Sequence, residues 1–449
     1  MSKEGVPLLN PKSQDSTWSK FKDSFSQLYN SPRELWFILA INFFNFAGFG
    51  FLTFSFTIYL TEVLGFSDKN TGWVYSGFGI SNGVYSVLFG SVPSRYGISK
   101  SLQIGSSLGI LGYFIAVFSS NFYVQLGAIF VFVMLCLSIN VPTTKLAVKK
   151  YTYQSNRSIA YSFYYLAFSV SGVIAGIVID LIVNETGATL QTFQVIFGLG
   201  ILMFTITLVL SLFLRELDLE EFGELEQKVY LEESAVQHIK EVVSLKSFWR
   251  YMALVVFLIV SKSLYFHLGA TLPIYMFRTL GRGAHFGYML AFHKVVLLFS
   301  MPAFTILVYL FRHYSLLVIG GVLSALSPLV MLWGDSYWTI AVFLALLGVG
   351  EAIWSPRLTD YTIEIAPKGK ESTFLALAST PYSLSVILTG VLSGQLLAEY
   401  CPGTYSEDCY LVWVFISGVT LVSPIVMTAF RKCLEQDPDK AYESCVSEF

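Results

Sequence analysis

The sequence is poor in charge. Charged residues make up 13% of its 449 positions, whereas a soluble chain carries about 25%. Hydrophobic residues make up 54% and aromatic residues 16%, and the mean hydropathy is +0.62. This composition excludes a large soluble protein. Because a helix crosses the ~30 Å hydrocarbon layer of a bilayer in roughly 20 residues, the composition predicts an all-α membrane protein whose chain is divided into transmembrane spans.

The signatures of several other protein classes are also missing. The net charge of −2 and the scattering of basic residues at span ends exclude a nucleic-acid partner. The sequence has no Walker loop, hydrolase elbow or metal-ligand pair. We therefore expect neither an enzyme nor an ATP-driven pump, and no metal or cofactor. Residues 1–30 lack the apolar core of a signal peptide, so we expect the N-terminus to be retained.

Apolar segments bounded by charge, glycine or proline predict the spans. Six precede a polar interruption and six follow it, so the hydropathy pattern is duplicated and predicts twelve helices in two six-helix bundles. The first six are predicted at 35–61, 71–93, 102–120, 122–146, 159–183 and 192–214. The second six are predicted at 249–277, 284–311, 315–334, 337–365, 373–399 and 410–430.

The polar interruption at 215–248 separates the two bundles. It carries nine acidic residues against four basic ones and therefore cannot lie in lipid. Its apolar residues recur at partly helical spacing, which predicts a short amphipathic helix on the membrane surface. The predicted regions are a cytosolic tail at 1–34, the first bundle at 35–214, this linker, the second bundle at 249–430 and a cytosolic tail at 431–449.

The loop charges predict the orientation. Ten Lys and Arg residues fall on short loops at the side that holds the N-terminus, against three on the other side, which places the N-terminus in the cytosol. The sequon at Asn184 then lies outside the cytosol and is predicted to be glycosylated. The sequon at Asn156 lies in the cytosol and should not be glycosylated. Cys401 and Cys409 share another non-cytosolic loop, where they form a disulfide or remain free thiols.

The loop from Gly90 to Lys100 resembles the loop motif of the major facilitator superfamily. Gly90, Arg95, Gly97 and Lys100 match the motif, and Ser94 stands where it has an aspartate. The resemblance implies a transporter of twelve helices. It also implies that Gly90, Arg95 and Gly97 help to latch the inner ends of the helices, without the charge relay that the aspartate would complete.

The stretch from Gly350 to Pro356, with Ala366-Pro367 after it, is similar to the tenth helix of proton-dependent oligopeptide transporters. In that family the glutamate helps to hold the amino end of the peptide, and the resemblance implies this role for Glu351. The run from Arg157 to Tyr165 resembles the same family more weakly. The sequence departs from the family in the span at 35–61, which has no interior charge in place of the proton-coupling motif.

Ionisable residues inside the spans are the candidate site. Placing an ionisable side chain near the bilayer centre costs at least ~2.5–3.5 kcal/mol, so each of these residues is expected to have a structural or functional role. Lys145 and Asp180, in the first half, lie near span ends, where Lys145 can extend to the surface. The second half holds the others, which are Lys262, His267, His293, Lys294, Glu351, Arg357 and Asp360.

Helical spacing indicates which charges can pair. Arg357 and Asp360 are three residues apart and can pair on one helix face. Glu351 lies nearly two turns before Arg357, so we expect its partner on another helix, such as Lys262 or Lys294. Glu351 is therefore the best candidate for a carboxylate that exchanges a proton for a ligand. The alternative is a permanent structural ion pair.

The remaining candidates have two interpretations each. His267 and His293 either relay protons or are satisfied by a neighbouring helix. Asn42, Asn45 and Tyr165, in the uncharged first half, either line a cavity through hydrogen bonds or hold helices together.

These features predict a secondary active transporter that moves a small organic solute by alternating access, with proton coupling and a peptide or amino acid-like substrate. The alternative is a membrane receptor or scaffold on the same fold. The expected partners are the solute, the proton and the lipid bilayer, and we expect a monomer. Glu4, Leu8 and Leu9 resemble an acidic dileucine signal read by sorting adaptors, which favours a lysosomal, vacuolar or endosomal membrane over the plasma membrane.

Overall fold

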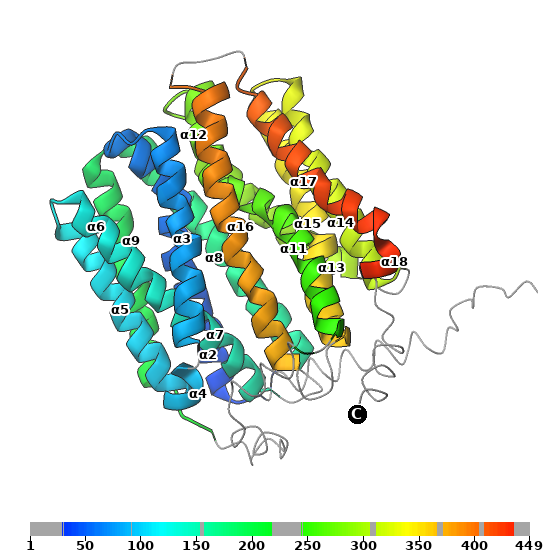
Figure 1. The fold of residues 1–449 in the computed structure, drawn as a ribbon. Helices are drawn as coiled ribbons and strands as arrows, with labels where there is room; N and C mark the ends of the chain where they lie inside the picture. The colour runs from blue at the N-terminus through cyan, green and yellow to red at the C-terminus, as the bar shows by residue number, and fades with distance from the viewer. Residues whose placement is uncertain are drawn as a thin grey trace, which may run out of the picture.

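The computed structural model describes residues 31–90, 92–152, 157–217, 246–305, 311–365, 371–403 and 408–434, together with Tyr29 and Ser244. Every regular element in these ranges is helical, and most of the long helices run along one common direction (Figure 1). The predicted all-α membrane fold is therefore confirmed. The amphipathic helix predicted inside the linker falls outside the described residues.

The first half contains six helical passes. Two of them change their winding along their length, because α2 continues into the π-helical turn η1 and α6 continues through η2 into α7. The elements are α2 (Arg33–Ile58), η1 (Tyr59–Val63), α3 (Asp68–Phe89), α4 (Val92–Tyr96), α5 (Ile98–Phe118), α6 (Phe122–Ala128), η2 (Ile129–Val133), α7 (Met134–Lys150), α8 (Arg157–Thr186) and α9 (Leu190–Leu212).

The second half also contains six passes, one of them broken. The elements are α11 (Lys246–Ala270), α12 (Leu272–Thr279), α13 (Phe286–Thr305), α14 (His313–Leu326), η7 (Ser327–Trp333), α15 (Tyr337–Ile365), α16 (Glu371–Tyr400), α17 (Leu411–Ala429) and α18 (Arg431–Leu434).

The span predicted over 249–277 is divided at Thr271, between α11 and α12. Pro273 is the cause, since it has no N–H to donate to the carbonyl of Gly269 four residues earlier. Thr57 of the first half donates its hydroxyl to that carbonyl instead, over 3.0 Å. The break thus becomes a contact between the two halves.

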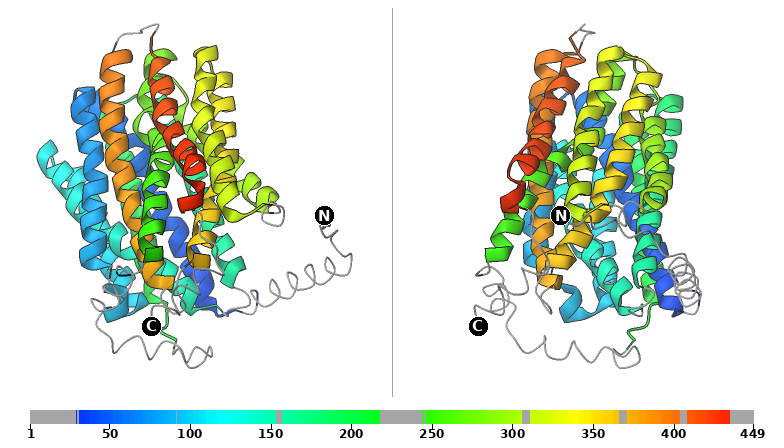
Figure 2. Two further views of the ribbon diagram at one scale, coloured as in Figure 1. Left: turned by 45° about the vertical axis from the view of Figure 1, so that its right-hand side comes forward. Right: turned by 90° about the vertical axis from the view of Figure 1, so that its right-hand side faces the viewer.

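Ten helical segments in the described residues are long and apolar enough to cross a membrane. Helix α3 is not among them, although it runs through the bundle beside α16 (Figures 1 and 2). Its small and polar residues explain this, because they contact the other half of the protein. Ser76 donates to the carbonyl of Ile387 over 3.0 Å, and Asn82 donates to Ser383 over 3.3 Å.

The two ends of the bundle differ in how the halves pack. We call the end at Cys401 the disulfide end, and the end at which α9 stops and α11 starts the linker end (Figure 1). At the disulfide end, buried residues of both halves form one apolar core, whose first and last members in the sequence are Phe51 and Ile416. Toward the linker end each half has a core of its own, around Leu35 in the first and Phe248 in the second. Among the described residues, the halves therefore join at the disulfide end.

Candidate functional site

Glu351 on α15 and His293 on α13 face each other inside the second half. Their Oε2 and Nε2 atoms are 3.4 Å apart, and their side chains are 15% and 1% exposed. Gly348 on α15 favours this close approach, because a Cβ there would lie 3.0 Å from Val296 Cγ1 of α13, a tight contact that would require the valine to shift. The predicted partner from another helix is thus found, but the group in direct contact is a histidine and not a lysine.

Lys294, next to His293, lies between the two halves. Its ammonium donates to the hydroxyl of Tyr265 and lies 4.4 Å from the centre of that ring. It also lies 4.6 Å from the ring centre of Phe168, on α8 of the first half. Gly172 leaves room for the lysine stem, since a Cβ there would be 3.2 Å from Lys294 Cγ. Lys294 therefore contacts both bundles and lies within electrostatic range of Glu351.

Lys262 on α11 lies within electrostatic range of Glu351. Its ammonium is 5.7 Å from the ring centre of Tyr382 on α16. Lys145 was predicted to lie near a span end, and it lies five residues before α7 ends at Lys150, with its side chain exposed.

His267 belongs to a different set of contacts. Its Nδ1 lies 2.7 Å from the hydroxyl of Thr271, which donates to Ser393 of α16 over 2.8 Å. The ring is fully buried, and Nε2 has no hydrogen-bond partner among the described residues. Thr271, four residues further along the chain, therefore satisfies one of the two ring nitrogens of His267.

Arg357 is buried in α15, with 6% of the residue exposed. The side chain of Asp360 falls outside the described residues, so the Arg357–Asp360 pair stays a prediction. In the first half, Asn42 donates to the carbonyl of Tyr164 over 3.0 Å, and Asn45 accepts from Asn140 over 3.0 Å.

Both asparagines are buried inside the first bundle, which favours a role in holding helices together. Tyr165, on the same helix as Phe168, is 42% exposed and remains a candidate lining residue.

The loop motif is held by an acid that sequence reasoning did not assign to it. Gly97 has a φ of +80°, a left-handed conformation that favours glycine. Glu216, just after α9, accepts from the backbone N–H of Ser99 over 2.8 Å and pairs with Lys150 over 3.0 Å. Because Ser99 lies in the first turn of α5, the carboxylate also stabilises that helix N-terminus. Gly90 ends α3, and Arg95 is exposed.

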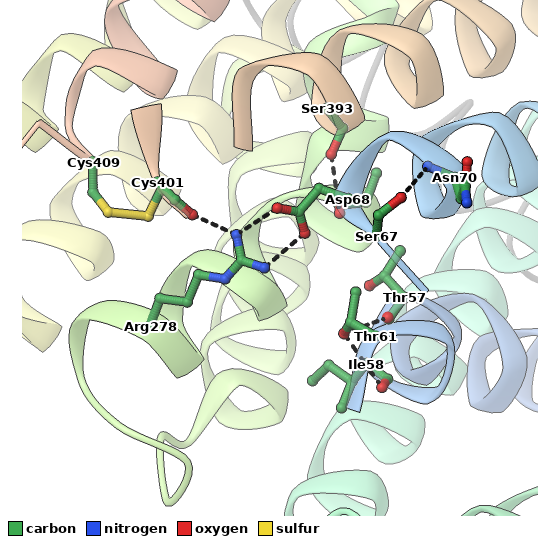
Figure 3. A network of polar contacts seen from close by, with 11 residues as sticks. Thr57, Ile58, Thr61, Ser67, Asp68, Asn70, Arg278, Ser393, Cys401 and Cys409 are labelled. Carbon is green, nitrogen blue, oxygen red and sulfur yellow. Dashed lines mark hydrogen bonds and ion pairs between the residues drawn. A yellow bond between two sulfur atoms is a disulfide. The ribbon is translucent and has the colours of Figure 1, made fainter. Parts of the chain in front are cut away.

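At the disulfide end a nearly buried ion pair joins the halves (Figure 3). Arg278 of α12 donates to both carboxylate oxygens of Asp68 of α3, over 3.0 and 2.6 Å, with the two side chains 13% and 11% exposed. Arg278 also donates to the carbonyl of Cys401, and Cys401 and Cys409 form a disulfide. One arginine therefore connects the first half, α12 and the disulfide loop.

A second carboxylate, Asp180 of α8, acts at the same end. Its Oδ1 accepts from the backbone N–H of Gly287 over 2.9 Å, at the start of α13, and its Oδ2 lies 2.7 Å from Nδ1 of His285. Asn184 is exposed in the last turn of α8 and donates to Asp180 over 2.9 Å. The predicted glycosylation site thus lies beside a contact between the halves.

The predicted sorting signal of Glu4, Leu8 and Leu9 lies outside the described residues. Within the part of the chain that the structure describes, no three His, Cys, Asp or Glu side chains gather in a way that could hold a metal ion.

Comparisons with known proteins agree with this architecture. The sequence model described as Major Facilitator Superfamily matches residues 38–315. No curated protein sequence matches the chain. Among solved structures, a POT family transporter in complex with 5-aminolevulinic acid is similar, with a TM-score of 0.75 and 14% identity over 90% of this chain and 97% of that one.

Two further structures cover 90% of this chain. A peptide transporter POT in complex with sulfate has a TM-score of 0.71 and 15% identity, over 95% of its own length. A mutant of the nucleoside transporter NupG has a TM-score of 0.66 and 14% identity, over 100% of its length. At these identities the likeness shows a shared fold.

Proposed function

The chain belongs to the major facilitator superfamily and is an integral membrane protein with many spans, and on that premise we propose that it is a proton-coupled secondary transporter of a small organic solute. The observation that carries the proposal is the contact between Glu351 and His293, a titratable pair placed beside Lys294, the lysine that contacts both bundles. Such a pair can take up or release a proton as its surroundings change.

Alternating access is supported by the packing of the halves. They share a core and two carboxylate contacts at the disulfide end, whereas toward the linker end their described cores are separate. Rocking of the bundles would break the first set of contacts and close the other end. With the predicted orientation, the disulfide end, where the described halves join, lies on the non-cytosolic side.

Proton coupling follows from the chemistry of the Glu351–His293 pair. In a site shielded from water, a carboxylate is held in its charged form by nearby cations and becomes neutral when they move away or bind elsewhere. A solute that draws Lys262 or Lys294 away from Glu351 would therefore promote its protonation. The candidate substrate is peptide or amino acid-like, as for the similar transporters, whose structures hold 5-aminolevulinic acid or a peptide conjugate.

A receptor or scaffold on the same fold is the alternative function. The discriminating experiment is uptake by vesicles that contain the purified protein, with an imposed proton gradient. Accumulation that disappears with an uncoupler supports the carrier. Saturable binding without flux would contradict it and support the receptor.

We also propose a lysosomal, vacuolar or endosomal membrane, because Glu4, Leu8 and Leu9 match an acidic dileucine pattern on the tail predicted to be cytosolic. The double variant Leu8→Ala, Leu9→Ala should then shift a tagged protein to the plasma membrane. Unchanged residence of this variant in fluorescence microscopy would remove the support for the signal.

A further inference from the structure

A groove lies between α3 and α16 near the disulfide end, where these helices of the two halves run side by side (Figure 1). It holds about 360 Å³ and is lined by Lys69 and Trp73 of α3 and by residues of α16 that include Gln395 and Glu399. The helices are in close contact beside it, because a Cβ at Gly394 would lie 2.6 Å from the carbonyl of the residue before Lys69. The groove therefore spans the junction of the two halves.

The charged residues that line the groove are Lys69 and Glu399, and both are exposed. Among the described residues neither has an ion pair, and the nearby Asp68 and Arg278 pair with each other. Lys69 lies in the first turn of α3 and Glu399 in the last turn of α16, so each helix dipole acts in the same sense as the side chain at that end. One cation and one anion without partners are complementary to a ligand that carries both charges.

Apolar side chains of α3 continue from the groove toward the linker end. Beyond Asn70, each exposed residue of α3 that the structure describes is apolar, and four of them are between 50% and 62% exposed, which are Trp73, Ile80, Val84 and Leu88. Their spacing of seven or four residues places them on one face of the helix. At 1.5 Å per residue this stripe is about 22 Å long, more than the ~15 Å half-thickness of the hydrocarbon layer. It is therefore long enough to lie along an acyl chain.

We propose that the groove binds a zwitterionic phospholipid of the leaflet at the disulfide end. Its phosphate contacts Lys69, the cation of its headgroup contacts Glu399, and an acyl chain lies along the stripe of α3. The indole of Trp73 lies between the charged and the apolar part of this surface, as tryptophan does at the headgroup level of membranes.

A phospholipid fits this surface better than a soluble zwitterion, because a soluble zwitterion would contact the groove but leave the stripe uncovered. An anionic phospholipid would meet Lys69 but would place no cation beside Glu399. The bound lipid contacts α3 of the first half and α16 of the second, and so favours the conformation in which the halves join at this end. This inference goes beyond the proposed transport function and is independent of the solute.

Native mass spectrometry of the purified full chain in detergent measures the binding. The probes are phosphatidylethanolamine, which is zwitterionic, and phosphatidylglycerol with the same acyl chains, which is anionic. The wild-type protein should retain phosphatidylethanolamine at a concentration lower by about threefold or more, because Glu399 attracts its ammonium. Equal or stronger retention of phosphatidylglycerol would overturn the proposal.

Three variants test the position of the lipid. Glu399→Gln should remove the preference for phosphatidylethanolamine, and Lys69→Gln should weaken the retention of both lipids. Gln395→Trp should fill the groove with both charges in place and so displace both lipids. Glu185→Gln, which removes an exposed acid in the last turn of α8, is the control and should bind as the wild type does. Unchanged retention in all three groove variants would show that the lipid lies elsewhere and would overturn the proposal.

Thermal unfolding and the mass spectra then distinguish the lipid from other occupants. Phosphatidylethanolamine should raise the melting temperature of the wild-type protein but not that of Gln395→Trp. Phosphoethanolamine, the headgroup without acyl chains, should leave both unchanged. Equal stabilisation by phosphoethanolamine would show a site for a soluble zwitterion and overturn the lipid assignment. A dimer of the lipid-free wild-type protein that Gln395→Trp dissociates would show that a second copy fills the groove, and would also overturn it.

Discussion

At the scale of single residues, two histidines that look alike in the sequence have different surroundings. His293 lies 3.4 Å from Glu351, whereas His267 contacts Thr271 of its own chain segment at 2.7 Å. Both rings are buried, so burial alone does not distinguish them. Their partners do, because a histidine beside a carboxylate can share its proton, while one beside a hydroxyl mainly fixes a hydrogen bond.

The first prediction compares these histidines. His293→Gln keeps a side chain that can donate to Glu351 but cannot be protonated, so proton-driven uptake should fall by about tenfold or more and its dependence on pH should flatten. His267→Gln should keep the wild-type pH profile, because glutamine can still contact Thr271. The measurement is initial uptake by vesicles across a range of external pH. Identical profiles for His293→Gln and the wild-type protein would contradict the assignment.

At the scale of helices, the two halves meet through glycines. Gly172, Gly176, Gly390 and Gly394 each lie close to atoms of another helix. A Cβ at Gly176 would lie 2.6 Å from the carbonyl of Gly287, and one at Gly390 would lie 2.5 Å from that of Gly72. These contacts are with backbone atoms, which cannot yield as a flexible side chain can. The crossings therefore depend on the absence of a side chain.

The second prediction tests the crossing of α3 and α16. Gly72→Ala would place its Cβ 2.3 Å from the carbonyl of Gly390, so the helices must separate, and we expect a loss of about 1–3 kcal/mol of stability. Gly198→Ala on α9 is the control, since no atom lies within 4 Å of its Cβ, and it should be neutral. Thermal unfolding in detergent measures both. Equal melting temperatures for the two variants would refute the close crossing.

The third prediction concerns the charges that join the helices at the disulfide end. Asp68 and Arg278 are nearly buried, whereas in the pair of Glu62 and Arg282, 3.0 Å apart, the arginine is 84% exposed. Removing one member of a buried pair leaves an unpaired charge and costs about 3–5 kcal/mol, whereas exposed pairs contribute about 0–1 kcal/mol.

A double-mutant cycle with Asp68→Asn and Arg278→Gln should therefore give a large coupling energy. The cycle with Glu62→Gln and Arg282→Gln should give almost none. Similar coupling energies in the two cycles would show that the Asp68–Arg278 contact does not hold the halves together.

Hydropathy was sufficient to predict the helices but not their irregularities. The predicted span at 192–214 corresponds to α9 at Leu190–Leu212, because the pattern of apolar residues sets where the helix runs. Pro273 frees the carbonyl of Gly269 beside the break at Thr271, and such prolines are tolerated inside transmembrane helices when another group bonds to the freed carbonyl. That group, Thr57, lies in the other half of the chain.

The sequence was enough to predict which residues belong to the candidate site, but not which of them contact each other. Glu351, Lys262 and Lys294 could be identified because charged residues are rare in the spans. A charged side chain in lipid costs free energy and is expected to have a structural or functional role. The pairing of Glu351 with His293 depends on how separate helices pack. No local pattern in the sequence contains that information.

At the scale of the whole molecule, the predicted orientation assigns the disulfide end to the non-cytosolic side. The fourth prediction follows from it. Asn184 should carry a glycan in a eukaryotic host and Asn156 should not, because only the first is accessible to the glycosylation machinery of the secretory pathway. The measurement is the mobility shift after enzymatic deglycosylation. A shift that persists in Asn184→Gln but vanishes in Asn156→Gln would reverse the orientation.

The central claim is that Glu351 couples proton movement to solute movement across the whole molecule. Glutamine at this position keeps the size and most hydrogen bonds of the side chain but cannot change its charge. A purely structural Glu351 predicts a different result, namely poor folding of the variant, because cations near it would lose their counter-charge, with residual transport still responding to pH.

The decisive measurement compares proton-driven accumulation with counterflow in vesicles that hold equal amounts of folded wild-type and Glu351→Gln protein, using a solute that stabilises the wild-type protein. Counterflow exchanges solute for solute and needs no net proton movement. The account predicts that Glu351→Gln loses accumulation against a gradient and retains counterflow. Normal pH-driven accumulation by Glu351→Gln would contradict it.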